Sequence, residues 1–174
     1  FLARSYAAQF GNELTAAVFM GTCGPQNRMV FAAERKLADR MVDKFGAKSH
    51  HPLFSRMSIE RFNKAFAPNR TPSDWVTRDE AEVDRYVADP LCGFDFTVSG
   101  YRDVVYLQSE VTSDDWLRRL PKTLPVLLIS GDQDPLGDFG KGIRRLLTRL
   151  QETGHDAEMI LYPGARHALI TETN

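Results

Sequence analysis

The chain has 174 residues, a net charge of −1, 43% hydrophobic residues and 26% charged residues. These values are typical of one globular domain, and the charge argues against a nucleic-acid-binding protein, which normally carries a basic excess. Every apolar run is also shorter than the roughly 20 residues that a membrane-spanning helix needs.

Residues 1–10 are predicted to form a helix, because Leu2, Tyr6 and Phe10 recur every four residues. Gly11 and Asn12 should end it. The chain has no initiator methionine or signal peptide and starts within this helix, so we expect a fragment of a longer protein. The short apolar run over residues 16–22 predicts a strand that is buried on both faces.

Residues 25–112 show no strand pattern and are predicted to be helical. The helices are expected over residues 31–45, 58–67, 78–87 and 101–111. In the first of these, Leu37, Met41 and Phe45 share one apolar face. The sequence therefore predicts a helical insertion between two strands.

The α/β pattern returns near residue 124. Residues 126–130 and 157–162 predict strands, and residues 141–153 predict a helix that Gly154 ends. Its buried face is expected to hold Ile143, Leu146, Leu147 and Leu150. A strand, a helix and a strand at this spacing predict a right-handed βαβ unit with parallel strands.

One acid and one histidine follow these two strands. Alone, Asp134 could cap the following helix, and His167 could be a solvated loop residue. Together they follow consecutive parallel strands, whose carboxyl ends form the ligand-binding edge of an open α/β sheet. We therefore expect the Asp134 carboxylate to lie against the His167 imidazole, as the acid and base of a catalytic triad do. Asp132 and Asp138 remain alternatives for the acid.

The motifs around these two residues resemble a known family. Residues 131–137, Gly-Asp-Gln-Asp-Pro-Leu-Gly, and residues 162–167, Tyr-Pro-Gly-Ala-Arg-His, resemble the closing half of an α/β-hydrolase. They are most similar to the lysophospholipase and monoacylglycerol-lipase-like branch, which is grouped with S33 serine aminopeptidases. The resemblance implies that Asp134 is the triad acid and His167 the triad base. It also implies that residues 2–7 follow the nucleophile elbow and that residues 17–22 form the sixth strand.

The implied fold is a partial α/β-hydrolase fold. Residues 1–24 and 113–174 are expected to form the core, with parallel strands six to eight and flanking helices, and residues 25–112 a helical lid. The Gly-x-Ser-x-Gly elbow is missing, and Ser5, Ser99 and Ser130 do not fit it. We therefore expect the nucleophile upstream of residue 1 and an isolated chain that is inactive. The last helix of the family, which normally follows the eighth strand, is also missing.

The expected function is cleavage of small or lipid-like carboxylic esters without a cofactor or metal. The main alternative is a non-catalytic α/β-hydrolase-like binding module, and peptidase or haloperoxidase chemistry on the same fold also stays open. A nucleotide-binding domain is disfavoured because its glycine-rich phosphate loop is absent. Cys23 and Cys92 are too few for a disulfide scaffold or a zinc site, so we expect reduced thiols and a cytoplasmic protein.

Other residues receive structural interpretations. His50 and His51 are expected in a surface loop of the lid, and Arg166 in an ion pair with Asp134, Asp138 or a lid carboxylate. A set of aromatic residues either lines an acyl pocket or forms the lid core: Phe31, Phe54, Phe62, Phe66, Trp75, Phe94, Phe96 and Tyr101.

The sixth strand should have a bare apolar edge around residues 18–20, because the fifth strand of the family is not in this chain. Exposed strand edges seek partners. We expect this edge to pair with the missing N-terminal piece, with another copy of the chain, or with a rearranged segment.

Overall fold

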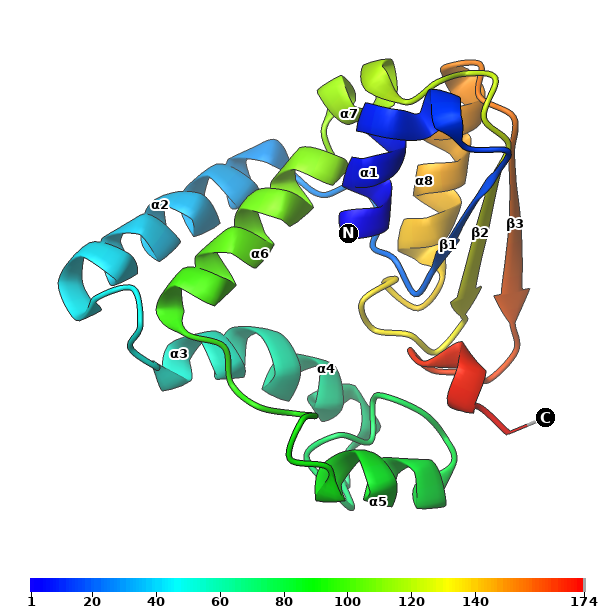
Figure 1. Ribbon diagram of the computed structural model, residues 1–174. Coiled ribbons are helices and arrows are strands. Elements are labelled where there is room, and N and C mark those ends of the chain that lie inside the picture. The colour runs from blue at the N-terminus through cyan, green and yellow to red at the C-terminus, as the bar shows by residue number, and fades with distance from the viewer. Residues whose placement is uncertain (174) are drawn as a thin grey trace.

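A computed structural model describes residues 1–173, apart from the side chains of Ser55 and Ser58. The protein contains a three-stranded parallel sheet in the order β1-β2-β3, which lies at one side of the molecule (Figure 1). The strands are β1 (Ala17–Met20), β2 (Val126–Gly131) and β3 (Ala157–Tyr162). Ala17 lies opposite Val126, which lies opposite Ala157, so all three strands begin level and end at the same edge of the sheet.

Helices α1 (Leu2–Phe10), α7 (Asp114–Arg119) and α8 (Lys141–Glu152) pack with the sheet around the main core. In α8 the buried apolar residues are Ile143, Leu146 and Leu150, which confirms the predicted face, while Leu147 is partly buried. Gly154 follows the helix with φ of 81°, a left-handed conformation that suits glycine at this position. The predicted strand, helix and parallel strand are therefore confirmed.

The opposite face of the sheet is open in the described residues. Val18, Met20 and Ile160 are 56%, 44% and 46% exposed, whereas Ala17 and Phe19 are buried. The prediction that residues 16–22 are buried on both faces is therefore wrong for this chain. The physical reason is that the helices flanking the sheet cover one face, so successive side chains alternate between the core and solvent.

Helix α1 forms as predicted, but it presents its apolar stripe to solvent. Leu2, Tyr6 and Phe10 are 76%, 49% and 44% exposed. Its buried residues are Arg4, Ser5, Ala7 and Ala8. The small side chains of the two alanines let the helix lie close to its neighbours, and the large apolar side chains stay largely exposed among residues 1–173.

The segment between β1 and β2 is mainly helical and extends away from the sheet (Figure 1). Its longer helices are α2 (Arg28–Phe45), α5 (Glu80–Ala88) and α6 (Val98–Val111), which agree with three of the predicted helices. The fourth, predicted over residues 58–67, is a short π-helix (Arg56–Glu60), the short α4 (Arg61–Asn63) and a 3₁₀-helix (Lys64–Phe66). The short helix α3 (Pro52–Ser55) precedes it. No helix in residues 1–173 is both long and apolar enough to span a membrane.

Polar side chains set the starts of the longer helices. The side chains of Asn27, Asp79, Thr97 and Ser113 accept hydrogen bonds from amides in the first turns of α2, α5, α6 and α7. Helices α2 and α6 pack together around a second, smaller core. Its buried members are Ala38, Met41, Phe54, Val98 and Tyr101.

Arg4 joins α1 to the insertion and to the end of β1. The residue is 1% exposed, and its guanidinium donates to the carbonyl oxygens of Cys23 (2.9 Å) and Val111 and lies 4.2 Å from the ring centre of Trp116. The Trp116 indole donates in turn to the Arg4 carbonyl oxygen (2.7 Å). Burial lowers the pKa of Arg4 to about 10, so the side chain stays charged at neutral pH. The carbonyl oxygens and the indole face compensate for much of the hydration lost by this charge.

Candidate active site

Asp134 and His167 meet at the carboxyl edge of the sheet. Asp134 follows the end of β2 by three residues, and His167 follows the end of β3 by five. The His167 Nδ1 atom lies 3.0 Å from the Asp134 Oδ2 atom, which is hydrogen-bond distance. The Asp134 carboxylate is fully buried, and the His167 side chain is 27% exposed. The pair thus has one member inside the protein and one member at its surface.

The turn after β2 fixes the carboxylate. Asp134 Oδ1 accepts a hydrogen bond from the Leu136 amide (2.9 Å), which leaves Oδ2 for the histidine. The Asp134 carbonyl oxygen accepts a hydrogen bond from the Phe139 amide (2.9 Å). Phe139 and Asp138 have φ of 53° and 54°, left-handed values that turn the chain sharply into α8. The turn therefore holds Asp134 through both its side chain and its backbone.

Two glycines let the loop that carries His167 approach the sheet. A Cβ atom on Gly131 would lie 2.0 Å from the Ala165 carbonyl oxygen, so only glycine fits there. Gly21, after β1, has φ of 57°, and a Cβ atom on it would lie 3.2 Å from Cε1 of the His167 ring. Because Gly21 and Gly131 lack side chains, this loop packs directly against the backbone at the ends of β1 and β2.

The two alternative acids lie elsewhere in the site. Asp132 Oδ1 accepts from the Gly164 amide (2.8 Å) and so holds the turn that precedes His167. Asp138 forms an ion pair with Arg145 (2.9 Å) on α8. Asp134 is the acid whose carboxylate reaches the imidazole.

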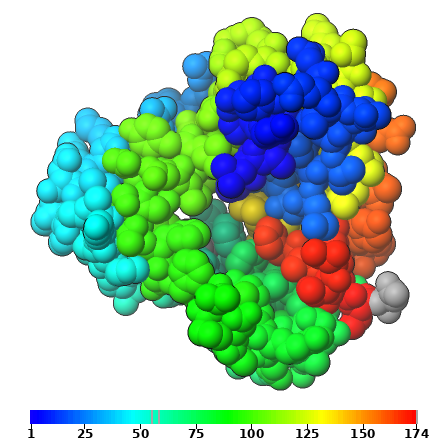
Figure 2. Space-filling view, in the orientation of Figure 1, coloured from blue at the N-terminus to red at the C-terminus, as the bar shows by residue number. Residues whose placement is uncertain are grey.

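The insertion also contacts His167, through Trp75. The ring centres of Trp75 and His167 are 4.9 Å apart with an angle of 33° between the rings. The Ala168 amide donates to the Val76 carbonyl oxygen (2.7 Å). In Figure 2 the red C-terminal segment lies directly against the green part of the insertion. Sequence reasoning named Trp75 only within a set of aromatic residues, and nothing in its spacing singled it out.

Arg166 has different partners from those predicted. Its guanidinium donates to the carbonyl oxygens of Asp74 and Thr77 and lies 4.2 Å from the ring centre of Phe66. The expected ion pair with Asp134, Asp138 or a lid carboxylate is therefore wrong for the described residues, because Nη1 of the guanidinium donates to main-chain carbonyl oxygens of the insertion instead. The nearby carboxylate of Glu172, which the sequence analysis missed, accepts from the Arg166 amide instead (2.7 Å).

The remaining candidates have structural partners. The hydroxyl of Ser130 donates to the Gly131 carbonyl oxygen, and that of Ser5 to Glu110. Ser99 shares a hydrogen bond with Thr97 at the start of α6. His51 accepts from the Leu53 amide (3.2 Å) as the cap of α3. In residues 1–173 no group of three or more His, Cys, Asp or Glu side chains could hold a metal ion.

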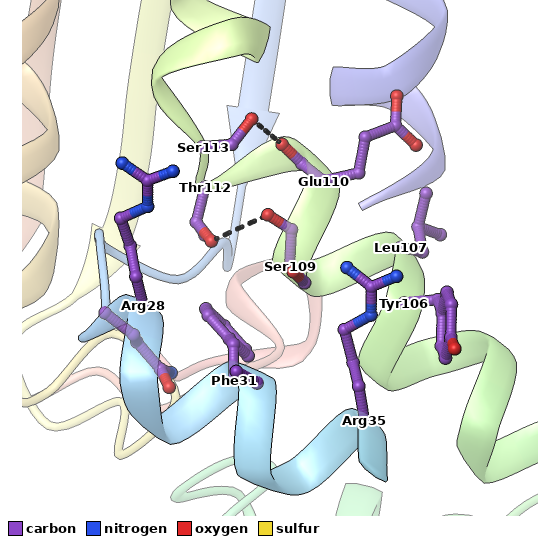
Figure 3. A pocket seen from close by; sticks show the side chains of 11 residues that line it. Arg28, Phe31, Arg35, Tyr106, Leu107, Ser109, Glu110, Thr112 and Ser113 are labelled. Carbon is purple, nitrogen blue, oxygen red and sulfur yellow. Dashed lines mark hydrogen bonds between the residues drawn. The ribbon is translucent and has the colours of Figure 1, made fainter. Parts of the chain in front are cut away.

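Two of the hollows on the protein differ in size, and His167 lines the smaller of these two. The larger, of about 720 Å³, lies between α2 and α6 and is lined by residues such as Arg28, Arg35 and Tyr106 (Figure 3). The hollow that includes His167 has a volume of about 430 Å³. Besides His167, it is lined by Trp75, Val76, Thr77, Glu82, Arg85, Tyr86, Asp89, Ala168 and Thr171. His167 therefore faces the smaller hollow, between the insertion and the C-terminal segment, while Asp134 is buried behind it.

Comparisons with known proteins identify the family from the sequence and the fold from solved structures. Residues 1–174 match the family described as "Serine aminopeptidase, S33". No curated protein sequence matches the chain. A thermostable carboxyl esterase from Bacillus coagulans is similar in structure, with a TM-score of 0.88 and 24% identity over 98% of this chain and 55% of that one.

Two further solved structures are similar. A monoglyceride lipase from Saccharomyces cerevisiae has a TM-score of 0.63 and 19% identity over 99% of this chain and 53% of that one. A monoacylglycerol lipase from Paleococcus ferrophilus has a TM-score of 0.62 and 18% identity over 98% of this chain and 57% of that one. The chain thus spans about half the length of these three proteins.

Proposed function

Because the chain belongs to the serine aminopeptidase S33 family and has a partial α/β-hydrolase fold, we propose that it is the C-terminal part of a hydrolase that cleaves carboxylic esters. The observation that carries the proposal is the hydrogen bond between the buried Asp134 carboxylate and the His167 ring. The names of the similar structures, a carboxyl esterase and two monoacylglycerol lipases, support small or lipid-like monoesters as the substrate class.

In this mechanism a serine hydroxyl attacks the ester carbonyl carbon while His167 Nε2 takes the hydroxyl proton. His167 then gives the proton to the leaving alcohol, and a water molecule hydrolyses the acyl-enzyme by the same route. Asp134 keeps the other proton of the ring on Nδ1 and stabilises the imidazolium that forms. The 3.0 Å contact and the full burial of Asp134 support this role, since a carboxylate shielded from water interacts more strongly with the charged ring.

We place the serine in a part of the protein that precedes Phe1, and with it the amides of the oxyanion hole. The half-length coverage of the similar structures supports this. The chain by itself should then be inactive, because loss of the nucleophile from a comparable triad lowers kcat about 10⁶-fold.

The same N-terminal part would cover the apolar surfaces that this chain leaves open. Strand β1 pairs with β2 on one side and with no strand of residues 1–173 on the other, and Val18 and Met20 are exposed on the open face of the sheet. The exposed stripe of α1, with Leu2 at 76%, lies in the same N-terminal region of the chain. Pairing with another copy is the alternative, whereas a rearranged segment is not seen on this edge in residues 1–173.

The helical segment over residues 25–112 would act as a lid over the site. The contact of Trp75 with His167 and the hollow shared by the insertion and the C-terminal segment support this assignment. The cytoplasmic location also stays a prediction, supported by Cys23 and Cys92 being free thiols.

The test is hydrolysis of p-nitrophenyl butyrate and of a monoacylglycerol by the full-length protein, with and without the exchange His167→Ala. We expect turnover by the unaltered protein and a loss of at least about 10³-fold in kcat for His167→Ala. A folded full-length protein that hydrolyses neither ester would favour the non-catalytic binding module. Full activity of His167→Ala would rule out the assigned base.

A further inference from the structure

His167 has two side-chain contacts of different kinds, and the triad explains one of them. Asp134 holds the Nδ1 atom at the edge of the ring, while the Trp75 indole lies against the ring with a centre-to-centre distance of 4.9 Å. A single hydrogen bond leaves an imidazole free to pivot about the bonded atom. A second contact that involves the face of the ring removes much of this freedom.

The backbone of Trp75 is itself held firmly. Its amide donates to the side-chain oxygen of Asn63 (3.0 Å), and the Asn63 side-chain nitrogen donates to the Thr71 carbonyl oxygen (2.7 Å). Asn63 is 6% exposed, so these bonds are shielded from water. The Trp75 ring also lies 5.3 Å from the ring of Phe62. Trp75 is therefore fixed by α4 and the turn that follows it.

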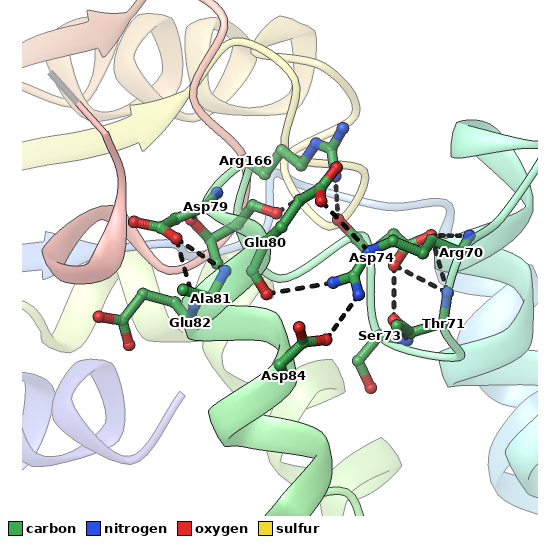
Figure 4. A network of polar contacts seen from close by, with 11 residues as sticks. Arg70, Thr71, Ser73, Asp74, Asp79, Glu80, Ala81, Glu82, Asp84 and Arg166 are labelled. Atoms are coloured by element: carbon green, nitrogen blue, oxygen red, sulfur yellow. Dashed lines mark hydrogen bonds and ion pairs between the residues drawn. The ribbon is translucent and has the colours of Figure 1, made fainter.

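Asp74 closes this turn. Its carboxylate accepts from the amides of Arg70 (2.6 Å) and Thr71 (3.0 Å) and from the Thr71 hydroxyl (2.5 Å). Burial by itself would raise the pKa of Asp74, but these hydrogen bonds outweigh it and lower the pKa below its ordinary value. The Asp74 carboxylate thus stays ionised, and its hydrogen bonds to Arg70 and Thr71 fix the chain directly before Trp75 (Figure 4).

The turn is also tied to the loop that carries His167, through residues on both sides of the histidine. Arg166 donates to the carbonyl oxygens of Asp74 and Thr77, as Figure 4 shows for Asp74. Glu172, whose side chain is 6% exposed, accepts from the Arg166 amide (2.7 Å) and from Nε of Arg78 (2.7 Å). Charge-assisted bonds of this kind are among the stronger polar contacts in proteins.

We propose that Trp75 is a positioning residue for His167, and that the contacts of Arg166 and Glu172 keep the Trp75 turn and the His167 loop in register. The inference rests on the proposed triad. The indole limits rotation of the imidazole about its bond to Asp134, and its electron-rich face attracts the imidazolium that forms during turnover. The insertion then contributes to proton transfer in addition to covering the site.

The first test compares kcat and KM of the full-length protein with those of Trp75→Leu and Trp75→Phe. We expect kcat of Trp75→Leu to fall about tenfold or more with KM within about twofold, because misorientation of a catalytic group slows the chemical step. Trp75→Phe keeps a ring against the histidine and should retain kcat within about threefold. An unchanged kcat for Trp75→Leu would overturn the proposal, as would a rise in KM alone, which would make Trp75 a substrate-binding residue.

A second test does not depend on turnover. In the same proteins, labelled with ¹³C and ¹⁵N in histidine, NMR reports the ring resonances of His167 and the proton that Nδ1 shares with Asp134. We expect Trp75→Leu to shift the ring resonances and weaken the Nδ1 proton signal through faster exchange with water. If the Nδ1 signal is unchanged, Trp75 does not position the ring, whether or not the protein hydrolyses esters.

The chain offers a matched control. Phe45 lies on His51 with ring centres 4.7 Å apart, at the end of α2 that lies away from the sheet in Figure 1. Phe45→Leu should shift the His51 resonances and leave those of His167 and the value of kcat unchanged; equal losses in both variants would refute a specific role for Trp75. If Trp75→Leu does not fold, Glu172→Gln tests the same positioning of His167 by the Trp75 turn. We expect it to lower kcat and to weaken the Nδ1 proton signal, and no change in either would count against the proposal.

Discussion

Replacing Asp134 by asparagine should reverse the proton arrangement of His167 while leaving the fold nearly unchanged. Oδ1 of Asp134 accepts a hydrogen bond from the Leu136 amide, and Oδ2 faces Nδ1 of His167. An asparagine that keeps the bond to Leu136 must place its carbonyl oxygen there, and its amino group then faces His167. An amino group is only a donor, so Nδ1 must become an acceptor and the ring proton moves to Nε2. Protonated Nε2 cannot take the proton of a serine.

The size of the effect follows from this change of tautomer. The corresponding exchange in a serine protease triad lowers kcat about 10⁴-fold, which is roughly 5.5 kcal/mol in activation free energy. We expect a loss of about 10³- to 10⁴-fold in kcat for Asp134→Asn in the full-length protein, measured with p-nitrophenyl butyrate. The thermal midpoint should change little, because the bond to Leu136 is kept.

Two matched variants make the test specific to Asp134. Asp132→Asn and Asp138→Asn carry the same chemical change on the same loop, but these carboxylates bond to Gly164 and Arg145. Each should keep kcat within about tenfold of the unaltered protein. A loss of 10³-fold in either of them, or a loss below tenfold in Asp134→Asn, would refute the assignment of the acid.

Three further exchanges test the surroundings of the pair. Gly131→Ala should lower activity and destabilise the protein by about 1–3 kcal/mol in urea denaturation, since its Cβ atom would lie 2.0 Å from the Ala165 carbonyl oxygen; unchanged stability would contradict the close packing. Arg4→Ala should cost more than about 2 kcal/mol in the same assay, because it leaves buried carbonyl oxygens without a donor, and a smaller loss would mean that water replaces the guanidinium. Asp74→Asn should lower the free energy of unfolding at neutral pH, and its difference from the unaltered protein should shrink below about pH 4. The reason is that folding lowers the pKa of Asp74, so the ionised carboxylate stabilises the protein at a pH above the pKa of the unfolded chain, and this contribution is lost as the pH falls. A difference that stays constant from pH 7 to pH 3 would contradict this sign.

The sequence predicted the elements whose pattern is local. The βαβ unit was predictable because β2, α8 and β3 each carry their own periodicity, and the residues after parallel strands must share one edge. This placed Asp134 and His167 near each other without coordinates. The irregular helix over residues 56–66 was predicted less well, since its turns depend on packing rather than on a repeating apolar face.

The burial of β1 on both faces was predicted wrongly for a physical reason. An apolar stripe identifies a surface that avoids water, but it does not identify which part of the protein covers it. Leu2, Tyr6, Val18 and Met20 have that character and are exposed within this chain. The Trp75 contact was not predictable either, because it joins residues 92 positions apart through a turn whose geometry depends on Asn63 and Asp74.

The proposed function rests on the assignment of Asp134 and His167 as two members of a triad whose serine lies outside these 174 residues. Labelling the full-length protein with a fluorophosphonate, followed by mass-spectrometric mapping of the modified peptide, tests it directly. We predict that the label is found on one serine N-terminal to Phe1 and that His167→Ala abolishes the labelling. A label on a serine within residues 1–174, or labelling that persists unchanged in His167→Ala, would contradict this assignment.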